Sequence, residues 1–328
     1  MFDSKAKLRN VAASQAPDRW REGILAVGTV LVLALLPIWV TGFMRYSLTL
    51  MLAHGISVLS VTFLIRYSGE VSIGQNFFVA TGAYAVAMLN SMWGVPFLVA
   101  VFVAVALSVV AGLLFALPSR GLSGVYLSVV TLALGLAAPD LLLHFSDYTG
   151  GVEGLQVDST IVKSWPVDLQ QYYVALAALV LVVCVVHRFR HSRIGLMILT
   201  TREHPHAAAS FGMTRGAARL SAFAFSAAIA GLGGAVFGFT TSMVSPNSFT
   251  FWSSVTLLVG SVVSYYSTRI YGVIVAGAFV ALTPQVLSNY GQVTLMIYGA
   301  VLLGATLVAN VGVPAVLRIL RRRSRRHV

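Results

Sequence analysis

The sequence predicts an all-α polytopic membrane protein with about ten transmembrane helices. Of its 328 residues, 58% are hydrophobic and only 10% are charged, and a soluble domain of this length could not bury so much apolar surface in one core. The apolar residues form runs long enough to cross a bilayer, which takes about 20 residues. The net charge is +12, but the basic residues cluster beside the apolar runs, so membrane orientation explains them better than nucleic acid does.

Ten apolar runs are the predicted spans. They cover residues 23–40, 46–65, 77–92, 95–117, 125–145, 172–186, 220–241, 253–266, 271–287 and 293–311. The third and eighth runs are short, which is typical of broken or tilted helices. The two longest polar connections are an outer loop at 146–170 and a cytoplasmic loop at 187–219.

The basic residues predict the orientation, because lysine and arginine accumulate on the cytoplasmic side of a membrane. With the N-terminus in the cytoplasm, all of the 22 lysines and arginines except Arg45 and Lys163 fall in cytoplasmic segments. An odd number of spans would leave one basic terminus outside. We therefore expect a basic cytoplasmic segment at 1–22, a transmembrane domain at 23–311 and a basic cytoplasmic tail at 312–328.

A polar, glycine-containing stretch lies between the second and third runs, at 66–76. Polar backbone at membrane depth is tolerated only when protein buries it or when it lines a wet cavity. The stretch fits either a re-entrant element beside a pathway or an ordinary cytoplasmic turn. His54, inside the second run, either contacts a solute or bonds a neighbouring helix. The candidate pathway residues are Ser72, Gly74, Gln75, Asn76, Tyr84 and His54.

Two loops carry further candidates. The outer loop holds Thr149, Gly150, Gly151 and Gly154, whose glycines predict a flexible or sharply turned segment that gates the outer face, docks a partner or merely connects two spans. In the cytoplasmic loop, Pro205 suits the first turn of a short helix, three alanines favour it, and Gly212 fits its end. Such a helix either docks into a soluble partner or lies on the lipid headgroups.

The sequence offers no catalytic constellation. None of its three lysines follows a Gly-x-x-x-x-Gly frame, so ATP would be bound by another polypeptide. No metal-ligand spacing or nucleophile elbow appears either, and the single cysteine, Cys184, excludes an intramolecular disulfide. We expect no enzyme activity, no cofactor and no metal.

Four motifs, in this order and spacing, resemble the LivM-type permeases of branched-chain amino acid ABC importers. They are the turn at 67–76 before Phe77-Phe78 and Gly-Ala-Tyr, the Arg-Gly…Val-Thr-Leu-Ala stretch at 120–133, the Thr-Gly-Gly-x-x-Gly-Leu loop at 149–155, and the arginine-rich loop ending in an alanine helix. The resemblance implies a type II-like ABC importer permease bundle in the bacterial inner membrane. It also implies ABC ATPase subunits, a second permease subunit forming a heterodimer, and a periplasmic solute-binding protein that docks near 149–155. The implied ATPase contacts are Glu203, Ala207, Ala208 and Gly212.

Two positions depart from the family pattern. Gln75 stands where the family usually has histidine, and residues 260–269 replace its Gly-Gly-x-Gly-Ser turn. The expected solute is therefore a branched-chain amino acid or a related small polar molecule such as urea, an amide or a carboxylate. A passive channel or a secondary transporter is the alternative, although the spans contain no chain of acidic residues for proton relay.

Overall fold

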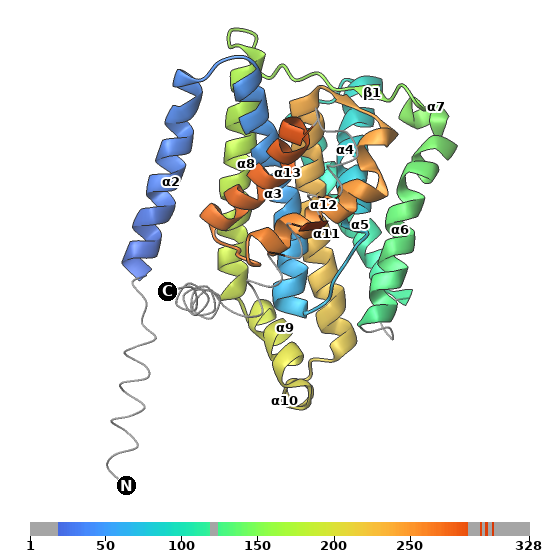
Figure 1. Ribbon diagram of the computed structural model, residues 1–328. Coiled ribbons are helices and arrows are strands. Elements are labelled where there is room, and N and C mark those ends of the chain that lie inside the picture. Colours follow the sequence, from blue (N-terminus) through green and yellow to red (C-terminus); the bar gives the residue numbers. More distant parts are fainter. Residues whose placement is uncertain (1–18, 119–123, 288–295, 297–298, 301–303, 305–328) are drawn as a thin grey trace, which may run out of the picture.

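The computed structural model describes residues 19–118, 124–287, 296, 299–300 and 304, and these form a helical bundle with one two-stranded ribbon (Figure 1). The elements, in order, are α2 (Arg19–Trp39), α3 (Phe43–Phe63), the π-helix η1 (Leu64–Ser68), α4 (Gln75–Trp93), α5 (Phe97–Ala116), α6 (Val125–His144), α7 (Ser146–Thr149), β1 (Leu155–Gln156), α8 (Val167–Arg190), α9 (Arg193–Glu203), α10 (Pro205–Ser210), α11 (Arg215–Thr241), β2 (Met243–Val244), the 3-10 helix η3 (Pro246–Phe249), α12 (Phe251–Val263) and α13 (Ile270–Leu287).

A helix lies over each of the first nine predicted spans. Five stretches are long and apolar enough to cross a membrane, namely Phe43–Ser68, Phe97–Ala116, Val125–His144, Val167–Arg190 and Arg215–Thr241. The apolar part of α2, α12 and α13 are shorter apolar helices. The tenth predicted span lies almost entirely outside the described residues, and so do the basic tail and most of the basic N-terminal segment.

Two predicted boundaries are wrong because polar residues extend the helices. α8 begins at Val167, not at 172, and ends at Arg190; Asp168 lies in its first turn and basic residues lie in its last, which suits the helix dipole. α11 begins at Arg215, where the Thr214 side chain accepts a hydrogen bond from the Ala217 N–H as an N-cap. The hydropathy of the sequence marks the apolar part of each helix and misses these polar ends.

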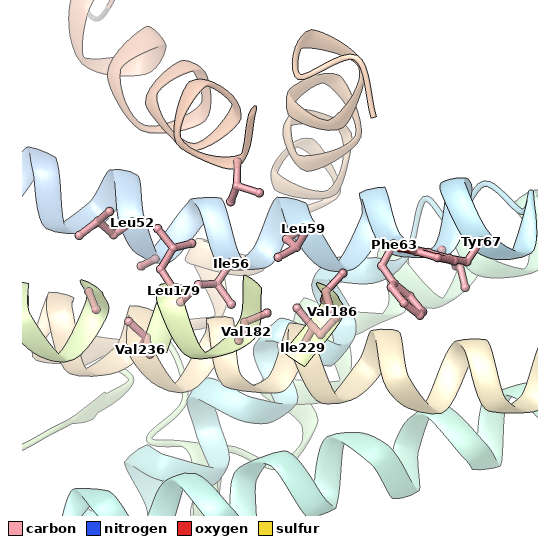
Figure 2. Packing of buried hydrophobic residues seen from close by; sticks show 14 of the residues in the cluster. Leu52, Ile56, Leu59, Phe63, Tyr67, Leu179, Val182, Val186, Ile229 and Val236 are labelled. Atoms are coloured by element: carbon pink, nitrogen blue, oxygen red, sulfur yellow. The ribbon is translucent and has the colours of Figure 1, made fainter. Parts of the chain in front are cut away.

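The core surrounds α3, which packs against α8 and α11 (Figure 2). Leu52, Ile56, Leu59 and Phe63 recur at helical spacing along α3, and all are at most 1% exposed, so they form one buried stripe. The best 18-residue window of α3 is 83% buried, whereas those of α5 and α6 are 28% and 22% buried. The central helix is therefore α3, and α5 and α6 leave most of their apolar surface uncovered by the described chain.

Close backbone packing joins α4 to α11. A Cβ atom on Gly82 would lie 2.1 Å from the Gly231 carbonyl oxygen, and one on Gly234 would lie 1.9 Å from the Val79 carbonyl oxygen. Only glycine allows these approaches, which is how helices pack tightly where no hydrophobic force drives them together.

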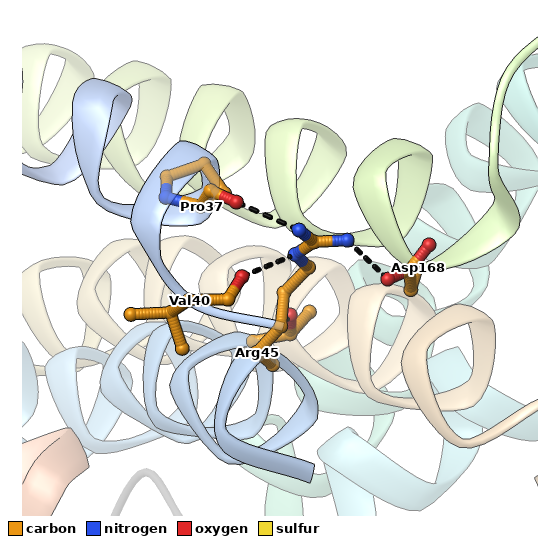
Figure 3. A network of polar contacts seen from close by, with 5 residues as sticks. Pro37, Val40, Arg45 and Asp168 are labelled. Atoms are coloured by element: carbon orange, nitrogen blue, oxygen red, sulfur yellow. Dashed lines mark hydrogen bonds and ion pairs between the residues drawn. The ribbon is translucent and has the colours of Figure 1, made fainter. Parts of the chain in front are cut away.

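An arginine clamp ties three helices at one end of the bundle (Figure 3). The Arg45 guanidinium donates to the Val40 carbonyl at 3.0 Å and to the Pro37 carbonyl at 2.7 Å, and it pairs with the Asp168 carboxylate. The clamp therefore joins the end of α2, the start of α3 and the start of α8. Arg45 and Asp168 both belong to the segments that the sequence predicts to be outside, and they lie at the end opposite to α9 and α10 (Figure 1).

Candidate functional site: a cavity between two broken helices and a coupling surface

The segment between α3 and α4 turns back into the bundle. Gly69 adopts a left-handed φ of 75° after η1, and the chain then runs without helix until α4 begins at Gln75 (Figure 1). The Ile73 N–H donates to the Thr131 hydroxyl at 3.1 Å. Thr131 lies six residues after Val125, about 9 Å along α6, so α4 begins inside the bundle. These contacts favour the re-entrant interpretation over a cytoplasmic turn.

Polar side chains at the start of α4 are buried. Ser72, Gln75 and Asn76 are 1%, 1% and 4% exposed. The Gln75 amide donates to the Ser226 hydroxyl at 2.7 Å, and that hydroxyl donates to the Ser60 carbonyl at 2.9 Å. Gln75 therefore links α4, α11 and α3, which is a packing role.

A second interrupted element meets the first. The chain leaves β2 of the two-stranded ribbon and passes through η3, and α12, with only 13 residues, begins at Phe251. The Asn76 amide approaches the Thr250 carbonyl at 3.5 Å, so the first turns of α4 and α12 are neighbours. Paired interrupted helices of this kind line the solute sites of many transporters.

A cavity of about 340 Å³ lies beside these two helix starts. Its lining includes His54 and Ser57, halfway along α3, together with the polar side chains of Asn76, Ser248, Ser253 and Thr256. Aromatic and aliphatic side chains also line it, among them Phe237, Phe249, Trp252 and Leu257. Trp252 is 55% exposed, so the cavity opens at its rim. Such a mixed lining is typical of sites for small amphipathic solutes.

The cavity includes only two of the six predicted pathway residues, His54 and Asn76. The ring centroids of His54 and Phe237 lie 5.5 Å apart. Among the described residues His54 makes no hydrogen bond, which argues against the hypothesis that it bonds a neighbouring helix. Tyr84 is buried against Phe249 instead. Gly74 abuts α6, because a Cβ there would lie 2.0 Å from the Thr131 carbonyl oxygen.

The cavity lining differs from the predicted pathway residues in both directions, by leaving out Ser72 and by including hydroxyl side chains that were not predicted. Ser72 is buried without a hydrogen-bond partner among the described residues and does not belong to the cavity lining. Ser57, Ser253 and Thr256 do belong to it, yet they lie within apolar runs, where serine and threonine usually bond neighbouring helices. The short eighth run is the signal that could have drawn attention to Ser253 and Thr256.

The predicted short helix in the cytoplasmic loop is present as α10, at the tip of the bundle (Figure 1). Pro205 is its first residue, and Gly212 ends the turn with a left-handed φ of 80°. Glu203 and Ala207 are exposed, but Ala208 is only 2% exposed. The methyl group of Ala208 packs within the chain, and its contact with a partner stays a prediction. Phe211, which was not among the predicted contact residues, is 77% exposed at the same tip.

Charged side chains connect this tip to the re-entrant segment. Arg202 of α9 donates to the Ile65 carbonyl at 3.3 Å and to the Arg66 carbonyl, both in η1. Arg219 of α11 donates to the Glu70 carboxylate at 2.5 Å. A second cavity, of about 270 Å³, lies between these groups. Burial raises the pKa of the Glu70 carboxyl above its usual value, against the opposing effect of the Arg219 guanidinium.

The glycine-rich outer loop is a defined turn. Thr149 is buried and donates to the Leu142 carbonyl at 2.7 Å. Gly150, Gly151 and Gly154 all have left-handed φ angles, of 73°, 57° and 76°. A Cβ on Gly154 would lie 2.1 Å from the Val244 carbonyl oxygen, so the turn packs directly on β2.

Comparison with known proteins places this architecture in a family. The family described as the permease component of branched-chain amino acid transport systems matches residues 43–310. The LivM permease proteins of the high-affinity branched-chain amino acid transport systems of Salmonella typhimurium and Escherichia coli are each 29% identical over 280 residues, which covers 77% of this chain and 66% of theirs. The chain thus spans just under two thirds of these relatives. No solved structure matches. The match over residues 43–310 shows that the chain belongs to the branched-chain amino acid transport system permease family.

Proposed function

We propose that this chain is the transmembrane permease subunit of an ATP-driven ABC importer that moves branched-chain amino acids or a related small polar solute across the inner membrane. The observation that carries the proposal is the cavity where α4 and α12 begin inside the bundle, in a chain of this permease family. We further propose a ten-span, type II-like bundle with both termini in the cytoplasm. This arrangement assigns α10 to the cytoplasmic side and the β1–β2 ribbon to the periplasmic side.

The cavity lining suits a neutral or zwitterionic solute with an apolar portion. Among the described residues, none of those that line the cavity is an aspartate, glutamate, lysine or arginine, so a solute with a charged side chain would leave that charge unpaired in a poorly hydrated site. Asn76 and His54 offer hydrogen bonds to a polar head group, while Phe237, Phe249 and Leu257 surround an aliphatic group. An amino acid with a branched apolar side chain has both features.

Three partners fit three surfaces. Glu203, Ala207, Phe211 and Gly212 present an exposed tip to ABC ATPase subunits, where ATP hydrolysis would take place. The defined outer turn at Thr149, Gly150, Gly151 and Gly154 offers a firm docking surface to a periplasmic solute-binding protein. A second, different permease subunit closes the open rim of the cavity at Trp252.

A passive channel or a secondary transporter is the less favoured candidate. An ion-coupled transporter needs ionisable groups beside its solute site, and the described lining offers only the imidazole of His54. A passive channel needs no ATPase-docking tip. Membership of the permease family also supports the importer.

The proposal is tested by Asn76→Leu, which removes the amide but keeps a similar volume. In liposomes that hold the complete importer, with its ATPases, second permease and binding protein, we expect the apparent KM for leucine uptake to rise about tenfold, as the loss of a buried hydrogen bond predicts. The control is Thr29→Val on α2. Thr29 is also a polar residue in a predicted span, but its hydroxyl donates to the Leu25 carbonyl of its own helix. Unchanged uptake kinetics in Asn76→Leu would contradict the pathway assignment.

A further inference from the structure

The re-entrant segment is held firmly at its cytoplasmic end by two arginines from different elements. Arg202 donates to two carbonyls of η1, and Arg219 pairs with Glu70 just beyond η1. Arg202 lies next to Glu203, the last residue of α9, and only His204 lies between α9 and α10, which begins at Pro205. Any displacement of the α9–α10 tip is therefore passed directly to the backbone of residues 65–70.

The other end of the same segment forms one wall of the solute cavity. Six residues, 69–74, connect Gly69 to α4, and such a stretch spans at most about 20 Å when extended. Ile73 is bonded to Thr131, Gln75 is bonded to Ser226, and Asn76 lines the cavity. The segment is thus attached at both ends, near η1 and at the first turn of α4.

The Glu70–Arg219 pair is poorly explained as a source of stability. Its side chains are only 12% and 9% exposed, and the Glu70 Oε2 atom has no hydrogen-bond partner among the described residues. Taking two charges out of water costs about as much as their attraction returns, and an apolar pair of similar size often stabilises a fold as well or better. A buried ion pair that joins two moving elements is better understood as a device that fixes their relative position.

The backbone at this point also has the means to move. η1 is a π-helical turn that ends in the left-handed Gly69, and π-turns occur frequently at functional sites. The left-handed φ of 75° at Gly69 favours glycine, so the chain can change direction there. Gly69 is therefore the pivot of the segment, between the Arg202 contacts at Ile65 and Arg66 and the Arg219 contact at Glu70.

We infer that residues 64–74 form the mechanical link between the ATPase-docking tip and the solute cavity, with Glu70, Arg202 and Arg219 as positioning residues that make the first turn of α4 follow the movement of α9 and α10. This inference rests on the proposed function, because it assigns a task to the ATPase-docking tip. It adds a specific route, from Arg202 through η1 and Glu70 to Asn76.

The test measures solute uptake and ATP hydrolysis together in liposomes that contain the complete importer. We expect Glu70→Gln to lower the number of leucine molecules taken up per ATP by about tenfold, within the usual range of coupling free energies. The charge-reversed double variant Glu70→Arg with Arg219→Glu should recover part of the lost uptake per ATP, because it restores an ion pair. A role in folding alone would reduce the amount of complex and leave the ratio unchanged.

The matched control is Asp168→Asn, which breaks the ion pair between Arg45 of α3 and Asp168 of α8, at the opposite end of the bundle. We expect it to retain the wild-type ratio of uptake to ATP hydrolysis. Should Glu70→Gln fail to assemble, Arg202→Ala provides the decision, since it removes the second attachment on an exposed residue. A wild-type ratio in Glu70→Gln, or in Arg202→Ala, would overturn the link, whereas absence of ATP-driven uptake in the wild-type importer would refute the proposed function itself.

Discussion

At the scale of residues, Gly74 shows why the re-entrant segment tolerates so little change. Its Cα lies against α6, and a Cβ would meet the Thr131 carbonyl oxygen at 2.0 Å, which is backbone and cannot turn away. Thr131 also receives the hydrogen bond from Ile73, so both the shape and the polar contact of this crossing depend on one turn of α6. Substitutions here act on the position of α4 and, through Asn76, on the cavity.

We expect Gly74→Ala to destabilise the protein by about 1–3 kcal/mol, the usual cost of overpacking a core. The measurement is the thermal unfolding midpoint of the purified chain in detergent. The matched control is Gly28→Ala on α2, where an added Cβ would meet nothing within 4 Å and where alanine favours helix over glycine. Equal midpoints for Gly74→Ala and wild type would contradict the close approach of α4 and α6.

At the scale of elements, α9 and α10 depend on a precise turn at their end. The Met213 N–H donates to the Ala208 carbonyl at 3.1 Å and the Gly212 N–H donates to the Ala209 carbonyl at 3.0 Å, as at the glycine end of many helices. This turn buries Ala208 and leaves Phe211 exposed, so it sets the shape that an ATPase subunit would meet.

Gly212→Pro should abolish ATP-driven uptake while insertion into the membrane stays normal. Proline fixes φ near −65° and removes the N–H, so neither the left-handed conformation nor the hydrogen bond to Ala209 can form. The assay compares uptake and the amount of chain in the membrane. Gly42→Pro is the control, because Gly42 also has a positive φ, of 62°, with open space around it, but lies at the outer end. Wild-type uptake in Gly212→Pro would remove α10 from the coupling surface.

At the scale of the whole molecule, the sequence predicted the positions of the apolar helices well because apolar runs report directly on the bilayer, while the total of ten spans stays a prediction. Nine predicted spans coincide with described helices; the short eighth run corresponds to the 13-residue α12, whereas α4 over the short third run is a continuous helix of 19 residues. Helix ends were predicted less well, since Asp168 and Arg215 are polar residues that belong to helices. Long-range partners could not be predicted: Glu70 and Arg219 are 149 residues apart, and nothing local to either residue names the other.

The candidate site was predicted only in part for the same reason. His54 and Asn76 stood out because they are polar residues in or beside apolar runs. Ser57, Ser253 and Thr256 did not, since small hydroxyl groups are common in spans. Gln75 and Tyr84 attracted attention by their chemistry, yet packing turned them toward Ser226 and Phe249. The packing partners of a helix decide which of its faces lines a cavity, and a single sequence does not reveal those partners.

The central claim is that a solute passes through the cavity beside α4 and α12 when a separate ATPase acts on the chain. Its most direct test is the labelling rate of a single cysteine at Ser253→Cys, with Cys184 replaced by serine, in the complete importer. We predict that the solute-loaded binding protein together with ATP changes this rate, and that leucine in the cavity slows it. A labelling rate that is the same with and without ATP and solute would contradict the claim.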